Sequence, residues 1–118
     1  DARNQVARRY SDALGDIAAV PTMPAGTTSV WAQYTIRIAG GRRDAFASAL
    51  KTEGIPTAIY YPIPLHRQQA YKHFPIGKGG VAVSERLAAE VISLPMHAYL
   101  DPPTQDRIID AARRALRK

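Results

Sequence analysis

The sequence contains no cysteine, which excludes a disulfide framework, a thiolate metal site and a thiol nucleophile. No apolar run approaches the ~20 residues that a membrane-spanning helix needs, and no signal-peptide pattern opens the chain. We therefore expect a cytoplasmic protein without a membrane partner. With 118 residues, the chain is long enough for one domain with a single core and too short for two.

Motifs that would support catalysis are also missing. The three histidines, His66, His73 and His97, do not have the spacing of a metal site, and neither HExxH nor the nucleophile motif GxSxG occurs. Residues 77–80 are rich in glycine but lack the GxxxxGK[ST] pattern, which favours a surface loop over a phosphate loop. The lysines lie in segments that we expect to be exposed, whereas a Schiff-base lysine needs a pocket. We predict no catalytic residue, metal ligand or cofactor ligand in this chain.

The charge of the chain is strongly positive. It has 16 basic and 10 acidic residues, a net charge of +6, and most of the basic residues are arginine, which suits bidentate contact with phosphate or carboxylate. A solvated basic surface explains this charge, and a free-standing basic module that binds nucleic acid is the alternative. No nucleic-acid motif occurs and the aromatic residues lie away from the arginine-rich C-terminal segment, so we expect no nucleic-acid partner. A pure dimerisation or scaffold domain is a third possibility.

The first half of the chain shows clear periodicity. Residues 1–15 read as a helix with Val6, Tyr10 and Leu14 on one face, followed by a proline-containing loop. Residues 30–38 alternate as a half-buried strand, with Val30 on the buried face and Trp31 on the polar face. Residues 44–53 read as a second helix. Gly54 fits its left-handed C-terminal cap, and residues 57–61 form a short second strand between prolines.

The second half of the chain is predicted to be mostly helical. We expect a helical turn over 66–74, a helix from 84 to 91 capped by Ser84, a brief strand at 91–94 and a last helix that starts at Asp101-Pro102. The fold class is therefore α/β, an α+β-like small domain with a sheet of two to four strands packed by helices. We divide it into a connecting helix and linker, residues 1–20, and a compact domain, residues 21–118.

The segment from Gly54 to His66 is the best candidate for binding. It places Tyr60, Tyr61, three prolines and His66 directly after a strand, so it is stiff and extended and carries amphipathic rings. Because neighbouring residues of a strand point to opposite sides, at most one of the two tyrosines should be buried. Two aromatic strand residues without a ligand would explain the pattern equally well.

Several spaced motifs resemble one family. Val30 to Ile36, Arg43-Asp44, Gly54 to His66, Gln68 to Tyr71 and Ala88 to His97 occur in order, and together they look like the C-terminal domain of the DegT/StrS-type sugar aminotransferases. These are pyridoxal-phosphate (PLP) enzymes of fold type I. The match runs over most of the chain.

The resemblance implies a parent enzyme that moves an amino group, usually from glutamate, onto a nucleotide-linked keto sugar. It implies a homodimer whose PLP lysine lies in an N-terminal domain that is absent from this chain. The wording of the motifs is nearest to members that act on UDP-linked 3-keto sugars in O-antigen pathways. The chain begins at Asp1 without a methionine, so we expect a fragment that is inactive alone.

The resemblance also assigns site residues. Tyr60-Tyr61-Pro62 matches the family's usual His-Tyr-Pro, which reaches the nucleotide-sugar site at the dimer interface, so Tyr61 is a predicted substrate contact. Tyr60 replaces the more usual histidine and could stack or donate through its hydroxyl. His66 matches the Pro-Leu-His position and is expected to position the substrate rather than to transfer a proton.

Overall fold

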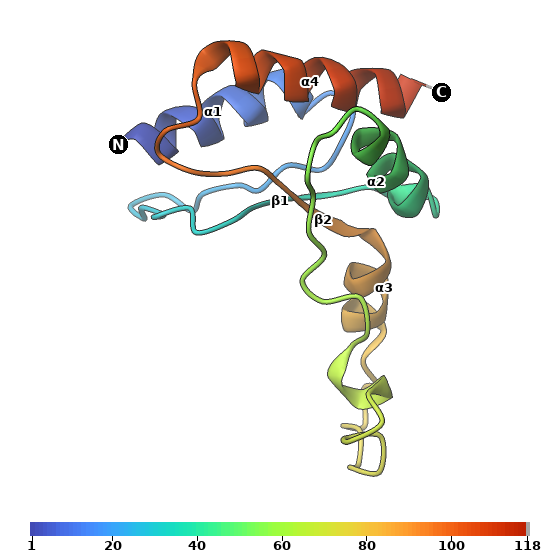
Figure 1. Cartoon of the computed structure of the whole chain (residues 1–118). Coiled ribbons are helices and arrows are strands. Elements are labelled where there is room, and N and C mark those ends of the chain that lie inside the picture. Colours follow the sequence, from blue (N-terminus) through green and yellow to red (C-terminus); the bar gives the residue numbers. More distant parts are fainter. Residues whose placement is uncertain (118) are drawn as a thin grey trace.

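The computed structural model describes residues 1–117 and has four α-helices and two strands in this range (Figure 1). The α/β fold class is confirmed, with a sheet at the lower limit of the predicted size. No helix in residues 1–117 is both long and apolar enough to cross a membrane. The elements in chain order are α1 (Ala2–Leu14), β1 (Tyr34–Arg37), α2 (Arg43–Thr52), the 3-10 helix η1 (Leu65–Arg67), α3 (Ala82–Glu90), β2 (Val91–Leu94) and α4 (Pro102–Arg117).

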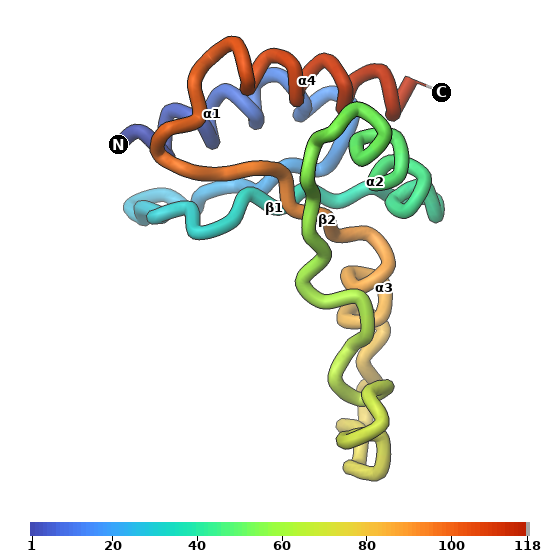
Figure 2. Tube along the Cα trace, viewed as in Figure 1, coloured from blue at the N-terminus to red at the C-terminus, as the bar shows by residue number. Residues whose placement is uncertain are grey.

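The elements form a layered body with one long projection. Helices α1 and α4 lie side by side above the two strands, and α2 packs against α4 at one end of the sheet (Figure 1). Residues 56–87, named the arm from here on, leave this body, run away from it and return through α3 (Figure 2). All but the last three residues of α3 therefore belong to the arm, and these three reach the body.

The sheet is shorter than the alternating pattern predicts. Strand β1 pairs antiparallel with β2 from Tyr34 opposite Leu94 to Arg37 opposite Val91. The next residue along β2 is Pro95, which has no N–H to donate, so pairing stops there. Val30 was expected to be buried but is 79% exposed, which is a correction to the predicted strand.

Trp31 also differs from its predicted place on the polar face. Its backbone φ is 47°, outside the strand region, and its ring packs against the core with its centroid 5.6 Å from that of Tyr34. The indole Nε1–H donates to Asn4 Oδ1 at 2.9 Å. The tryptophan therefore fastens the chain before β1 onto helix α1.

The predicted second strand at 57–61 is reduced to one pair. Ala58 exchanges two backbone hydrogen bonds with Ser93, 3.1 and 2.7 Å long, on the side of β2 away from β1. Pro56 before this pair lacks an N–H group, and Pro62 and Pro64 follow it closely. These prolines prevent a regular ladder, so the strand expected here is wrong in extent.

Helix α1 contributes directly to the core. The Tyr10 hydroxyl donates to the Pro95 carbonyl at 3.0 Å, Tyr34 shares a 2.8 Å hydrogen bond with Ser11, and Gln105 of α4 donates to the Val6 carbonyl at 2.8 Å. The predicted division into two parts at residue 20 stays a prediction, and α1 shares one hydrophobic cluster with the rest of the body. The largest fully buried side chains of this cluster are Tyr10, Leu14, Tyr34, Ile36, Phe46, Leu50 and Ile92.

The ends of α2 and α4 follow the sequence prediction. After α2, Gly54 has φ 71°, and the Ile55 and Gly54 amides donate to the Leu50 and Lys51 carbonyls, the two bonds of a Schellman motif. Before α4, Asp101 Oδ1 accepts from the Thr104 amide at 2.8 Å. Both motifs use only neighbouring residues, and Arg107 of α4 adds a hydrogen bond to the Glu53 carbonyl at the end of α2.

Helix α3 begins differently from the prediction. It starts at Ala82, and its N-terminal flanking residue, Val81, makes no side-chain capping bond. Ser84 therefore lies inside the first turn and is not the cap, which corrects the prediction. The serine faces a hollow described below.

The arm has no hydrophobic core of its own. None of its residues, all of which lie in the described part of the chain, is buried, whereas Ile55 before it and Ala88 after it both are. A segment that buries so little apolar surface gains little hydrophobic stabilisation by itself. Its exposed large apolar residues are Tyr60, Tyr61, Ile63, Leu65, Tyr71, Phe74, Ile76 and Val83.

We expect Tyr10→Phe to lower the free energy of unfolding by about 1–2 kcal/mol, because the part-buried Pro95 carbonyl loses its donor. Chemical denaturation measures this difference. Tyr99→Phe is the control, since Tyr99 is 92% exposed and its variant should unfold like the original protein. A Tyr10→Phe protein as stable as the control would contradict the assigned hydrogen bond.

The cap at Asp101 predicts a pH dependence. Hydrogen bonds from the Thr104 amide and hydroxyl lower the pKa of Asp101, so its carboxylate stabilises the folded state above the ordinary aspartate pKa of about 4. This stabilisation is lost as the pH falls through the lowered value. The stability of the original protein relative to Asp101→Ala should therefore shrink on acidification, measured by denaturation between neutral pH and pH ~3. A constant difference would count against the cap.

Candidate functional site

A hollow of about 550 Å³ lies between the proline-rich part of the arm and helix α3. Tyr60 and Tyr61 form part of one wall, and α3 with the start of β2 forms the other. The lining is mostly apolar, which suits the flat face of a ring. We name it the arm hollow, and its lining residues are Tyr60, Tyr61, Pro64, Leu65, Gln68, Ser84, Leu87, Ala88 and Val91.

A smaller hollow of about 260 Å³ lies beside it, at the end of the sheet. Its walls come from the chain before β1, from residues 56–58 and from residues 93–96. Gln33 adds a polar amide to this lining, and Tyr60 lines both hollows. Tyr60 therefore separates the two spaces, so a ligand that occupied both would pass over its ring.

The two tyrosines are accessible side chains held next to each other. Tyr60 is 47% exposed and Tyr61 is 72% exposed, so neither is buried. Their ring centroids are 5.9 Å apart at 74°, an edge-to-face arrangement that aromatic pairs favour, and the peptide bond between them is cis. Both side chains line the arm hollow and are accessible from outside.

His66 does not line the hollow with the tyrosines. Its Nε2 lies 3.1 Å from Glu85 Oε1, and Arg67 donates from Nε to the same oxygen at 2.9 Å. The pKa of Glu85 is lowered mainly by the hydrogen bond from His66 and next by the one from Arg67. These two contacts tie the 3-10 helix η1 to α3, so they hold the two walls of the hollow together.

Other potential chemical groups are scattered. His97 accepts from the Tyr99 amide at 3.2 Å, and His73 stacks on Phe74 with ring centroids 4.4 Å apart. Within residues 1–117, no group of three or more His, Asp or Glu side chains could hold a metal ion. The lysines in this range, Lys51, Lys72 and Lys78, are all exposed.

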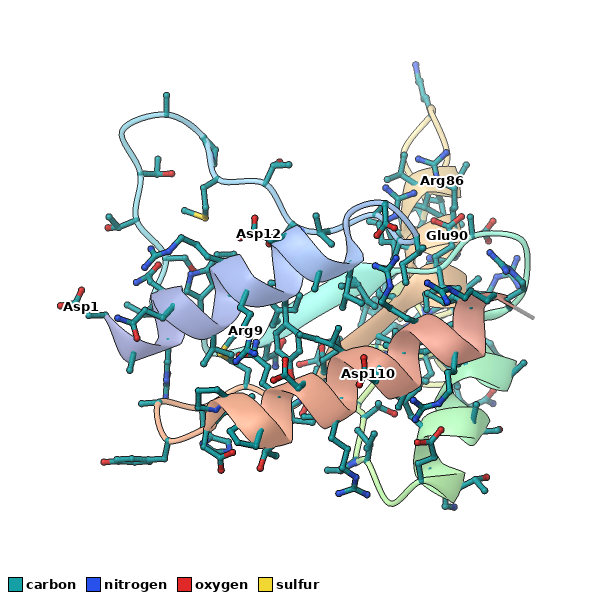
Figure 3. The ribbon with its side chains drawn as sticks, turned by 90° about the horizontal axis from the view of Figure 1, so that it is seen from above. Asp1, Arg9, Asp12, Arg86, Glu90 and Asp110 are labelled. Atoms are coloured by element: carbon teal, nitrogen blue, oxygen red, sulfur yellow. The ribbon has the colours of Figure 1, made fainter. Side chains whose placement is uncertain are left out.

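The arginines of α4 mostly contact the protein itself. Arg113 forms a two-pronged ion pair with Asp16, at 2.8 and 2.7 Å, and Arg114 pairs with Glu53 at 2.6 Å. Arg9 likewise reaches from α1 toward α4, where it pairs with Asp106 at 2.5 Å (Figure 3). These three arginines therefore have acidic partners within the protein.

Sequence analysis missed the wall of the hollow that α3 provides. Ser84 was expected to cap the helix and Ala88 opened one of the family motifs, and nothing in the spacing of Ser84, Leu87 and Ala88 identifies a ligand surface. It also gave no role to Arg43, which is buried and donates from Nη1 to the carbonyls of Ala88 and Val91, both at 3.0 Å. One indication was available, because a cation in the first turn of a helix is unfavourable unless it has another partner.

Comparisons with known proteins agree with the resemblance. The chain is 39% identical over 100 residues to the UDP-2-acetamido-2-deoxy-3-oxo-D-glucuronate aminotransferase of Pseudomonas aeruginosa, covering 84% of this chain and 26% of that protein. It is 40% identical over 117 residues to the UDP-N-acetyl-3-dehydro-alpha-D-glucosamine 3-aminotransferase of Acidithiobacillus ferrooxidans, covering 98% of this chain and 31% of that one. The chain thus spans less than a third of the length of these relatives.

The fold matches as well. A DegT DnrJ EryC1 StrS aminotransferase from Brucella abortus superimposes with a TM-score of 0.92 and 49% sequence identity, over 99% of this chain and 31% of that one. Residues 1–113 match the model of the DegT/DnrJ/EryC1/StrS aminotransferase family. The chain belongs to the DegT/DnrJ/EryC1/StrS aminotransferase family.

Proposed function

We propose that this chain is the C-terminal small domain of a longer aminotransferase that transfers an amino group to a nucleotide-linked keto sugar. The observation that carries the proposal is the arm hollow with Tyr60 and Tyr61 at its mouth, in a chain of this family. The relatives support the substrate class, since their names specify UDP-linked sugars with a 3-oxo or 3-dehydro group. The arm hollow would be one wall of the sugar-nucleotide site.

The cofactor of the family, PLP, does not fit the residues described here. PLP forms a Schiff base with a lysine whose amine loses its proton because a pocket shields it from water. The lysines in residues 1–117 are exposed instead. We therefore place the cofactor in another part of the parent enzyme, in an N-terminal domain. On this proposal the chain alone binds part of the substrate and does not transaminate.

The tyrosines suit recognition of the nucleotide. A phenol ring offers a flat apolar face for the base, and its hydroxyl can donate to a ribose or phosphate oxygen. Stacking of a base on an aromatic side chain contributes about 1–3 kcal/mol. Tyr60, next to Gln33 and both hollows, is suited to the linkage between base and sugar, and Tyr61, the more exposed ring, to the base itself.

His66 has a positioning role in this proposal. Its contact with Glu85 keeps the tyrosine-bearing segment next to α3, and His66 itself does not line the hollow. The finer identity follows the two UDP-specific relatives: a UDP-linked 3-keto sugar as acceptor, glutamate as donor, a homodimeric parent in the cytoplasm and a role in O-antigen synthesis. Each of these is proposed from family likeness.

We expect Tyr61→Ala in the full-length enzyme to raise KM for the sugar nucleotide about tenfold, because the stacking surface is removed. Tyr61→Phe keeps the ring and should show a smaller rise, which separates stacking from hydrogen bonding. Steady-state kinetics with the sugar nucleotide and the amino donor varied separately measure both effects.

Tyr99→Ala is the matched control, since Tyr99 is an exposed tyrosine that lines neither hollow. Its kinetics should equal those of the original enzyme. If Tyr61→Ala left turnover and sugar-nucleotide affinity unchanged, the assignment of the arm hollow to the substrate would be wrong.

A further inference from the structure

The orientation of the arm relative to the body depends on a few contacts at its base. None of the arm's residues, all within the described chain, is fully buried, and among them only Ile59, near the start of the arm, packs against the hydrophobic core. The first residues of the arm are attached to β2 through the Ala58–Ser93 backbone pair. The returning segment, where the end of α3 joins β2 just beyond the arm, is held by two arginines of the body.

Arg43 makes the more buried of these attachments. Its side chain is 9% exposed, and its Nη1 donates to the carbonyls of Ala88 and Val91, at 3.0 Å each. Its Nε donates to the Asp44 carboxylate at 2.5 Å, which neutralises the guanidinium. The Ala88 carbonyl is among the last four of α3, which have no partner within the helix.

The second arginine, Arg37, acts nearer to solvent. It donates from Nε and Nη2 to Glu90 Oε2, at 3.0 and 2.7 Å, and its side chain is 42% exposed. In the view from above, Glu90 lies where α3 meets the body and Arg86 lies further out along the helix (Figure 3). Glu90 is 14% exposed, so solvent screens this pair only in part, and Arg43 is the more buried of the two polar anchors.

The placement of Arg43 is unfavourable for its own helix. It occupies the first turn of α2, where the helix dipole repels a cation, yet its guanidinium lies at the C-terminal end of α3, where a dipole attracts one. Both carbonyls that it holds belong to residues lining the arm hollow, Ala88 and Val91. Arg43 itself does not line the hollow, so it contacts this wall only through the backbone.

We propose that Arg43 is a positioning residue for sugar-nucleotide binding: it fixes the α3 wall of the arm hollow at the distance from Tyr60 and Tyr61 that the ligand requires. The inference rests on the proposed function, because it assumes that the arm hollow receives the sugar nucleotide. Arg43 itself touches no ligand. Its effect is transmitted through two backbone carbonyls.

The test compares Arg43→Met with Arg42→Met in the full-length enzyme. Arg42 is the adjacent arginine and also donates to a backbone carbonyl at a helix end, that of Leu116 at 3.1 Å, but this carbonyl belongs to α4 and not to the arm. Arg43→Met should raise KM for the sugar nucleotide about tenfold or more and leave KM for the amino donor unchanged. Arg42→Met should change neither KM.

Hydrogen exchange gives a second readout that does not depend on catalysis. In Arg43→Met, amides of residues 82–91 should exchange faster while those of α1 keep their rates. Arg43→Lys is the variant that preserves the buried charge beside Asp44 if the methionine variant fails to fold. Because the lysine side chain is shorter, it should still raise the sugar-nucleotide KM.

The outcomes separate this proposal from the one it rests on. If Tyr61→Ala raises the sugar-nucleotide KM and both Arg43 variants leave it unchanged, the positioning role is wrong. If Arg43→Met raised KM for the sugar nucleotide and for the amino donor equally, and exchange were faster throughout the protein, Arg43 would have only a structural role. If Tyr61→Ala has no effect, the proposed function fails, and faster exchange confined to residues 82–91 would still support the anchor.

Discussion

The backbone pairing of Ser93 is the constraint on which both the body and the arm depend. On one side Ser93 lies opposite Thr35 of β1, and the two hydroxyls share a hydrogen bond of 2.8 Å. On the other side it exchanges both backbone bonds with Ala58, at the start of the arm. Because β2 follows α3 without a break, this four-residue strand connects the core of the body with both ends of the arm. Displacing β2 would move the tyrosines as well as the core.

The division of apolar residues between body and arm explains why the arm suits binding. Helices α1 and α4 bury their apolar faces with the sheet, and the two tyrosines Tyr10 and Tyr34 pack at the centre, with ring centroids 5.0 Å apart. The arm instead exposes its aromatic rings to solvent. Exposed apolar surface of this kind usually marks a place where another surface binds. On the proposed function, the remainder of a longer enzyme would cover these rings; the chain spans less than a third of the length of the relatives named above.

Local signals in the sequence predicted local structure well, and pairing between distant segments limited the rest. The Schellman motif at Gly54 and the cap at Asp101 need only neighbouring residues, so both were predicted. The predicted lengths of the strands were wrong because the end of a strand depends on its partner elsewhere in the chain. The pairing of β1 ends at Pro95, which is far from Val30 in the sequence. Ser84 failed as a cap because α3 begins two residues earlier, within a segment that has weak local signals.

The candidate site divides in the same way. Tyr60 and Tyr61 lie in a motif that can be read along the chain, whereas the opposite wall of α3 faces them only after the arm has folded back on itself. Arg43 falls between these cases. Its identity in the first turn of α2 conflicts with the helix dipole, and a conflict of this kind indicates a distant partner without naming it. The structure supplies that partner in the carbonyls of Ala88 and Val91, so an unfavourable local choice becomes the link between the body and the proposed binding surface.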